Sequence, residues 1–213
     1  MALQKKDFIE LEFTGRVKGG EVFDSNVKKD LEKLNSKANP GPLIFCLGEG
    51  MFLKGIEDFL IGKEIGKYTL ELSPDKAFGP RISKFIQTIP MNVFKNQNVR
   101  PFPGAMFNFD GKIAKILAVS GGRVIADFNN PLAGKDVVYE LNVLRKVEDL
   151  NEKIKSFINF FFKRDLDFSV QDKKIIIRTE KGTSQFIQMF EEKFKDIFNL
   201  SLEVQEIEQE PKQ

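Results

Sequence analysis

The stretch LIFCLGEGMFLKGIEDFLIGKEIGK, residues 43–67, decides the fold of the first part of this chain. It opens on an apolar run, Leu43–Cys46, which predicts a strand buried on both faces. A glycine-rich connection follows. Residues 55–60 then predict a short amphipathic helix that ends at Gly62 and has three apolar side chains on one face: Ile56, Phe59 and Leu60.

The segments on either side of this stretch predict the sheet that packs on the helix. Residues 8–17, FIELEFTGRV, alternate as a half-buried strand, and Gly19-Gly20 turns the chain into a second strand. VKKDLEKLNSK, residues 27–37, has helical spacing and is stopped by NPGP. KYTLELSP, residues 67–74, is a further strand. The order strand, strand, strand, short helix, strand predicts an α+β fold with an antiparallel sheet wrapped on a single helix.

Composition excludes several classes of function. The 213 residues contain one cysteine and no histidine, so neither a histidine-assisted nucleophile nor a histidine or thiolate zinc site is expected. We expect no metal and no cofactor. The net charge of +2 gives no broad signal for nucleic acid. A lone cysteine and the lack of a long apolar run predict a cytoplasmic protein that does not enter a membrane. Gly48–Gly55 departs from the nucleotide-binding patterns, because Leu53 stands where a dinucleotide loop needs its third glycine.

Residues 83–127 predict an inserted, β-rich module with its own hairpin tip at Gly121-Gly122. The module carries six basic residues against two acidic ones, and five of its residues are phenylalanine. Exposed Phe and Met suit the capture of unfolded chains, and we predict such a surface from Met91, Phe94, Phe102 and Met106. The alternatives are that these side chains form the small core of the module, or that the Phe and Lys residues bind RNA.

Residues 148–213 predict a third region with the order α-β-β-α-β, which makes a small two-layer domain. The helices are expected over 147–164 and 184–200, and the hairpin turns at Gln171-Asp172-Lys173. SLEVQEIEQE, residues 201–210, is expected as the closing strand. The phenylalanines of the first helix suggest self-association, so a homodimer through this domain is expected.

Four segments together resemble the FKBP-type peptidyl-prolyl cis-trans isomerases, in particular the SlyD-like branch with an insert-in-flap domain. They are GEVFDSN, the opening stretch, SPDKAFGP and NNPLAGKDVVYELNVL, and they occur in the family's order between residues 7 and 147. The last region resembles the extra C-terminal domain of long archaeal-type members. The resemblance implies three domains: an antiparallel half-barrel (1–82 and 128–147) around one short helix, the insert domain (83–127) and the C-terminal domain (148–213).

The resemblance also implies the site residues of a prolyl isomerase. Two hydroxyls that many relatives carry are missing at Phe13 and Phe78, whereas Tyr139 carries one where the family usually has none. The implied catalytic residues are Asp24, Phe45, Phe78 and Tyr139, and the implied substrate-binding residues are Phe13, Leu53, Ile56, Ala77 and Leu132.

A dry aromatic pocket is sufficient for this reaction, because rotating an Xaa-Pro amide breaks no covalent bond. The expected partners are unfolded or proline-containing polypeptides. One alternative stays open. The pocket would bind such chains without useful turnover, and the C-terminal domain would serve dimerisation or docking. The acidic ending EVQEIEQEPKQ differs from the His- and Cys-rich metal-binding tail of SlyD relatives.

Overall fold

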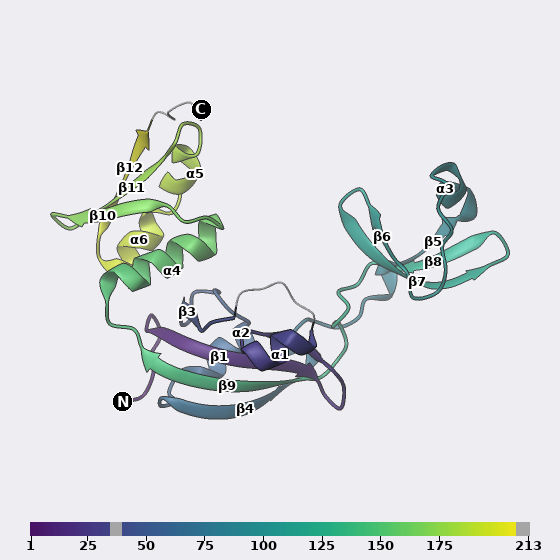
Figure 1. Cartoon of the computed structure of the whole chain (residues 1–213), viewed down its shortest axis with the longest axis horizontal. Coiled ribbons are helices and arrows are strands. Elements are labelled where there is room, and N and C mark those ends of the chain that lie inside the picture. The colour runs from purple at the N-terminus through teal and green to yellow at the C-terminus, as the bar shows by residue number, and fades with distance from the viewer. Residues whose placement is uncertain (35–39, 208–213) are drawn as a thin grey trace. The chain divides into compact units, whose positions relative to one another are not determined.

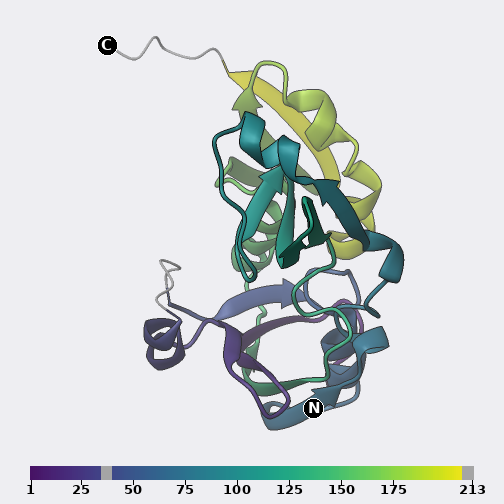
Figure 2. The ribbon, with the colours of Figure 1, turned by 90° about the vertical axis from the view of Figure 1, so that its right-hand side faces the viewer.

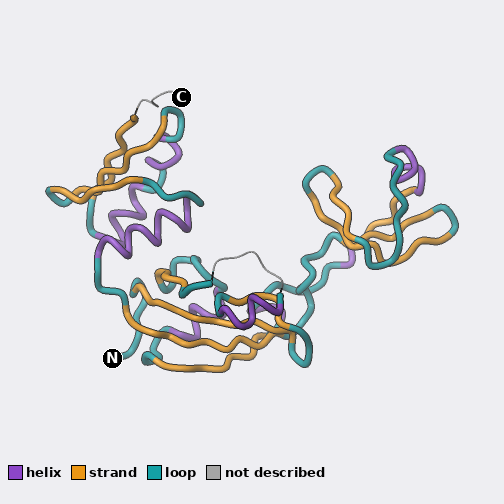
Figure 3. Tube along the Cα trace, viewed as in Figure 1, coloured by secondary structure: helices purple, strands orange, loops and turns teal. Residues whose placement is uncertain are grey.

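The computed structural model describes residues 1–34 and 40–207, and it is a mixed α and β structure (Figures 1 and 3). Its strand pairs are antiparallel in several places and parallel in one pair of the C-terminal sheet, which joins residues 174–180 and 201–207. The chain groups into two compact units. The first contains Met1–Thr14, Ser25–Tyr68 and Glu140–Gln213, and the second contains Gly15–Asp24 and Thr69–Tyr139.

The largest sheet contains five strands, ordered β2-β1-β9-β4 with β3 also paired to β1. The strands are β1 (Phe8–Val17), β2 (Val22–Ser25), β3 (Leu43–Cys46), β4 (Gly66–Leu72) and β9 (Val137–Lys146). Alternate residues of β9 are buried, as expected of a strand with one face on a core: Val137, Tyr139, Leu141 and Val143. The helices of this region are α1 (Lys28–Lys33) and α2 (Lys54–Leu60), and short 3-10 turns cover Pro74–Lys76 and Ser83–Phe85.

Strand β3 corrects one expectation. It was predicted to be buried on both faces, but only its second half, Phe45 and Cys46, is buried, while Leu43 and Ile44 are half-buried. β3 runs antiparallel to β1, with Phe8 opposite Cys46 and Glu10 opposite Ile44. Among the described residues β3 pairs with β1 alone, so it is an edge strand.

The insert forms its own four-stranded sheet, ordered β5-β8-β7-β6. Its elements are β5 (Ile86–Pro90), α3 (Met91–Asn96), β6 (Met106–Phe109), β7 (Lys112–Ser120) and β8 (Arg123–Asp127). The predicted hairpin tip is confirmed, since Gly121 and Gly122 join β7 to β8 with positive φ angles.

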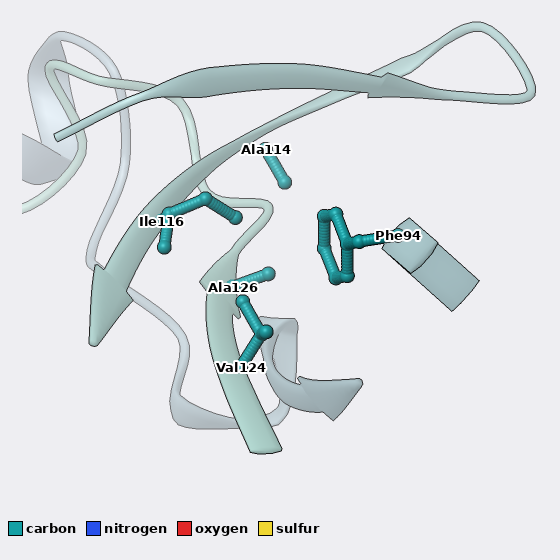
Figure 4. Packing of buried hydrophobic residues seen from close by; sticks show 5 residues of the cluster. All are labelled: Phe94, Ala114, Ile116, Val124 and Ala126. Atoms are coloured by element: carbon teal, nitrogen blue, oxygen red, sulfur yellow. The ribbon is translucent and has the colours of Figure 1, made fainter. Parts of the chain in front are cut away.

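The core of the insert lies on one face of this sheet and is capped by α3. Five side chains are buried there (Figure 4): Phe94, Ala114, Ile116, Val124 and Ala126. Phe94 also meets the rings of Phe107 and Phe109 edge-on at 5.4 and 5.7 Å. Phe94 is only 2 % exposed. Its predicted place on a chaperone surface is therefore wrong, because α3 points this ring into the sheet.

The C-terminal region has three strands, ordered β10-β11-β12, and its two short helices lie beside the last strand (Figure 2). The elements are α4 (Leu150–Phe162), β10 (Asp167–Gln171), β11 (Lys174–Glu180), α5 (Ser184–Gln188), α6 (Glu191–Phe198) and β12 (Ser201–Ile207). The turn between β10 and β11 is confirmed at Asp172 and Lys173, both with positive φ. The single helix expected over 184–200 is two helices, and Phe190 between them packs on Phe161 at 5.3 Å.

The C-terminal region packs on the beginning of the chain within the first unit. The rings of Phe8 and Phe198 lie 5.6 Å apart, Lys6 pairs with Asp196 at 2.7 Å, and Lys193 pairs with Glu49 at 3.1 Å. Apolar contact therefore attaches α6 to the first residue of β1, and ion pairs attach it to the segment before β1 and to the loop after β3.

Parts of two predicted elements, residues 35–37 of the first helix and 208–210 of the closing strand, lie outside the described residues. The described part of the chain contains no helix that is both long and apolar enough to cross a membrane.

Candidate functional site

A buried carboxylate organises the loop in front of α2. Glu57 is only 2 % exposed, and its two oxygens accept hydrogen bonds from the backbone N–H groups of Gly48 (2.8 Å), Gly50 (3.2 Å) and Phe52 (2.6 Å). A buried carboxylate is stable only when its oxygens are satisfied in this way. Glu57 thus fixes the conformation of the glycine-rich loop and the backbone position of Phe52 at its end.

Three rings of the first unit form what we call the helix-side cluster: Phe13, Phe45 and Phe52. The Phe52 ring lies 4.8 Å from Phe13 and 5.4 Å from Phe45. Phe45 is fully buried and Phe13 is 7 % exposed, whereas Phe52 is half-buried. Phe52 is therefore the accessible ring of this cluster. The prediction did not include it, although it directly precedes Leu53.

Phe45 and Ile56 were expected to line the wall and floor of an open pocket. Both are 0 % exposed, so neither presents a surface that a ligand can touch in this structure. Phe45 instead packs against the Phe52 ring, and Ile56 is one of the buried residues with which α2 contributes to the core. This corrects the expected contact role of both residues.

Leu53 lies at the N-cap position of α2 and is half-buried. Its carbonyl accepts hydrogen bonds from the N–H groups of Ile56 and Glu57 at 2.8 and 3.1 Å. Within the described residues no acceptor is found for the Leu53 N–H. A backbone donor at the start of a helix is available for hydrogen bonding to a bound chain. This is compatible with the predicted substrate contact of Leu53, which stays a prediction.

Three rings of the second unit form the hairpin-side cluster: Phe23, Phe78 and Tyr139. Phe23 meets Phe78 at 5.6 Å and Tyr139 at 5.8 Å, both edge-on at 84°. Edge-to-face contacts of this kind favour a fixed ring arrangement. Phe23 and Phe78 are half-buried, whereas Tyr139 is 2 % exposed. The structure thus joins Phe78 and Tyr139 through Phe23. The prediction did not include Phe23, although it stands beside Asp24 in VFDS.

Gly15 has no side chain and so leaves room for the Tyr139 ring of this cluster. A Cβ atom at residue 15 would lie 2.8 Å from Cε1 of Tyr139 and 3.0 Å from Cζ of Phe23. Carbon atoms do not approach so closely without displacement, so only glycine lets the ring lie against the β1 backbone. Tyr139 therefore supports Phe23 from beneath and does not face an open hollow, which corrects its expected contact role.

The Tyr139 hydroxyl is held in its neutral form. Burial raises its pKa well above the ordinary value, and the negative charge of Asp24 raises it further. Asp24 itself is exposed. The pair can therefore supply a protonated hydroxyl and an exposed carboxyl group near the same ring cluster.

The NNPLAG turn, residues 129–134, lies between the insert and β9, and the side-chain amide of Asn129 holds its first residue in place. Asn129 donates from its backbone N–H and its Nδ2 to Asp127 Oδ1, at 2.9 and 2.6 Å, and also bonds both the N–H and the C=O of Ile82. Arg81 donates to Asp127 Oδ2 at 2.6 Å. This network ties together the two segments that enter and leave the insert.

The remaining predicted residues lie in turns near this network. Asn130 Oδ1 accepts a hydrogen bond from the Leu132 N–H at 2.8 Å, and the Ala77 N–H donates to the Pro74 carbonyl at 3.0 Å. Both Leu132 and Ala77 are half-buried. Their predicted substrate contacts stay predictions.

The Cys46 thiol is held in its neutral form and away from solvent. Cys46 is fully buried, and burial followed by the charges of nearby carboxylates raises the pKa of its thiol to about 12.

Comparison with known proteins assigns the family. Residues 1–92 match the family model of FKBP-type peptidyl-prolyl cis-trans isomerases, and residues 87–132 match a model described as FKBP26, IF domain. A short-type peptidyl-prolyl cis-trans isomerase of Methanocaldococcus jannaschii is 31 % identical over 146 residues, which are 66 % of this chain and 92 % of the relative.

Two bacterial relatives agree with this assignment. The FKBP-type 16 kDa peptidyl-prolyl cis-trans isomerase of Escherichia coli is 30 % identical over 67 % of this chain and 93 % of its own length. SlyD of Helicobacter pylori is 26 % identical over 68 % of this chain and 75 % of its own length. The chain belongs to the FKBP-type peptidyl-prolyl cis-trans isomerases, and it is an isomerase with SlyD-like relatives.

Proposed function

We propose that this isomerase rotates Xaa-Pro bonds in unfolded or partly folded chains, and that the prolyl ring contacts the hairpin-side cluster. The observation that carries this proposal is the row of ring contacts in which the half-buried Phe23 meets both the half-buried Phe78 and the buried Tyr139. These rings offer an apolar, rigid surface with little water, and Asp24 lies exposed at its border.

The chemistry needs no nucleophile. The barrier to rotation, about 20 kcal/mol, is chiefly lost amide resonance. In the twisted amide the charge separation of the planar form is lost, so an apolar surface favours the twisted form over the planar one more than water does. A hundred-thousandfold rate gain needs a differential stabilisation of about 7 kcal/mol. Contact of the prolyl ring with aromatic rings and fixation of the flanking backbone are the expected sources.

Tyr139 and Asp24 have different roles in this proposal. Tyr139 is a positioning residue, because it is buried and acts on a bound prolyl ring through Phe23. Asp24 is exposed and is proposed to polarise the amide next to the proline.

The insert is proposed to hold unfolded client chains on the face of its sheet opposite the Phe94 core. Strand β7 alternates, with Ala114 and Ile116 buried and Ile113 and Leu117 exposed by 59 % and 36 %. We call these exposed residues, together with Met106 and Ile125 of the neighbouring strands, the outer face. Of the residues predicted earlier, Met106 is 51 % exposed, and Phe102, in the loop before β6, is 63 % exposed. Met91 is half-buried and packs against the core.

Adjacent apolar side chains exposed on one sheet face suit promiscuous contact with client chains. Lys115 shares this face, since it lies opposite Met106 on β6 and is exposed. The outer face therefore combines apolar contact with a positive charge.

A second candidate function is a binding module without useful turnover. The burial of Phe45, Ile56 and Tyr139 favours it, since three of the expected contact residues are covered. In that case the C-terminal region, which the two matched segments do not reach, would serve as a dimerisation or docking domain of a long-form member. Phe186 and Met189, exposed by 52 % and 79 %, are its proposed contact residues.

A protease-free isomerisation assay on a peptide of the type Ala-Leu-Pro-Phe separates the two functions. An isomerase accelerates the exchange, and Asp24→Ala lowers the acceleration. A binding module shows peptide binding and no acceleration. Deleting the insert should leave turnover of this short peptide unchanged and abolish the acceleration of protein refolding. Unchanged refolding activity would overturn the role proposed for the insert.

A further inference from the structure

A groove of about 460 Å³ lies between the edge strand β3 and the helix α4, within the first unit. Ligand-binding pockets typically start at about 300 Å³, so the groove has room for a few residues of an extended chain. Its lining is apolar along β3 and mixed along α4: Pro42, Leu43, Ile44, Glu152, Lys155, Ser156, Asn159, Phe160 and Lys163.

The edge of β3 presents backbone groups of Ile44 to this groove, and they have no hydrogen-bond partner in the part of the chain that the structure describes. The Cys46 N–H donates to the Met51 sulfur at 3.4 Å, so it points away from the partner strand β1. In an antiparallel pair, alternate residues direct their N–H and C=O groups to the same side. The N–H and C=O of Ile44 therefore also point away from β1, toward the side where Ile44 lines the groove. No hydrogen bond from Ile44 to this side is found among the described residues.

The charges along α4 leave one cation available. Lys155 pairs with Asp165 at 3.5 Å, and Glu152 pairs with Arg145 at 3.0 Å. The Lys163 ammonium lies 4.4 Å from the centre of the Phe160 ring, and the described residues supply it with no carboxylate. A groove wall that ends in an aromatic ring and an ammonium group suits an apolar side chain followed by a carboxylate.

We propose that this groove binds an extended peptide segment of a client chain by strand addition to β3. The segment pairs its backbone with Ile44, places an apolar side chain on Phe160, and directs an acidic side chain to Lys163. This site needs no proline and is separate from the residues proposed for isomerisation. It would bind an acidic segment of a client chain while a proline elsewhere in the same chain is isomerised.

The test uses a fluorescein-labelled, proline-free probe, acetyl-Thr-Val-Phe-Val-Glu-Glu-amide, and measures its anisotropy with the full chain. We expect a dissociation constant below about 1 mM. A counterpart ending in Lys-Lys should bind at least about tenfold more weakly, because it lacks the charge-assisted contact. N-methylation of the central residues, which removes backbone donors, should weaken binding about fivefold. An excess of the Ala-Leu-Pro-Phe peptide should not displace the probe.

The chain offers a matched pair of lysines for the control. Lys163 and Lys173 are both exposed and both have positive φ angles, of 55° and 64°. Asparagine tolerates this conformation, so Lys163→Asn and Lys173→Asn remove one charge each at comparable backbone cost. Lys163→Asn should weaken probe binding at least about tenfold, and Lys173→Asn should leave it unchanged.

Four results would overturn the proposal: no binding up to about 1 mM, equal binding of the acidic and basic probes, equal effects of the two lysine variants, or displacement of the probe by the proline peptide. The last result would place the probe on the isomerase residues. Loss of isomerase activity with intact probe binding would contradict only the proposed catalysis.

Discussion

The Glu57 carboxylate accepts a hydrogen bond from the Phe52 N–H at 2.6 Å, and the Phe52 ring contacts both Phe13 and Phe45. One buried charge on α2 thereby determines where the accessible ring of the helix-side cluster stands. The same carboxylate holds Gly48 and Gly50, so the loop behaves as one unit with the helix.

Replacing this charge should loosen the loop. We expect Glu57→Gln to lower the free energy of unfolding by about 2 kcal/mol, because the amide has one acceptor oxygen for three donors and buries an NH2 group beside them. Urea unfolding measures the change. Glu64→Gln is the matched control, since the Glu64 side chain is 75 % exposed. Equal stabilities of the two variants would contradict the organising role of Glu57.

Gly15 should be irreplaceable for a steric reason. We expect Gly15→Ala to destabilise the protein by about 1 to 3 kcal/mol, since its Cβ would overlap the Tyr139 and Phe23 rings. The isomerase activity should fall with it, because Phe23 is displaced. The second-site change Tyr139→Leu should restore part of the stability to Gly15→Ala in a double-mutant cycle. Additive effects would show that the two residues do not meet.

The network at the base of the insert should respond to acid. Burial raises the Asp127 pKa, but the hydrogen bonds from Asn129 and Arg81 outweigh it and leave the pKa below the ordinary value. A depressed pKa means that the carboxylate stabilises the folded form above the unfolded pKa of about 3.9, and that this stability is lost as the pH falls through the lower folded value. Carbon-13 NMR of Asp127 should give a midpoint below about 3.9. Asn129→Ala should move this midpoint upward, and a midpoint at or above the ordinary value in the wild type would refute the network.

We expect the outer face of the insert to be the surface that binds unfolded chains. Ile113→Ser should weaken suppression of the aggregation of a reduced, unfolding client, because it removes an exposed apolar side chain and leaves the Phe94 core intact. Leu144→Ser, a change at a 38 % exposed apolar residue outside the insert, serves as the control. If both variants protect the client as well as the wild type, the outer face has no such role.

Several elements were predictable because local patterns determine them. The helix α2 follows from the spacing of Ile56 and Leu60, and the turn at Gly121-Gly122 follows from glycines, which accept positive φ. The turn at Asp172-Lys173 follows from a polar stretch with an Asp between two strand-like runs. The order of the four family segments predicted the isomerase, which the relatives bear out.

Side-chain exposure at the site was harder to predict. The residue type shows that Phe45, Phe94 and Tyr139 are apolar or aromatic, but it does not tell a ring that covers a core from a ring that faces solvent. The exposure of Phe94 depends on which face of α3 packs on the sheet. The burial of Tyr139 depends on Gly15, which has no side chain and so leaves room for the ring. Phe23 and Phe52 were missed for a related reason. Each stands next to a predicted residue, and neighbouring residues of a strand or loop point in different directions.

The hairpin-side cluster is proposed to bind the prolyl ring and to favour the twisted amide. The most direct measurement is kcat/KM in the protease-free assay for Phe78→Ala, with Phe59→Ala as the control, because Phe59 is also half-buried and meets Tyr68 edge-on at 5.8 Å. We expect Phe78→Ala to lower kcat/KM at least about tenfold, which corresponds to about 1.4 kcal/mol of lost transition-state stabilisation, and Phe59→Ala to change it little. Full activity in a folded Phe78→Ala variant would contradict the claim.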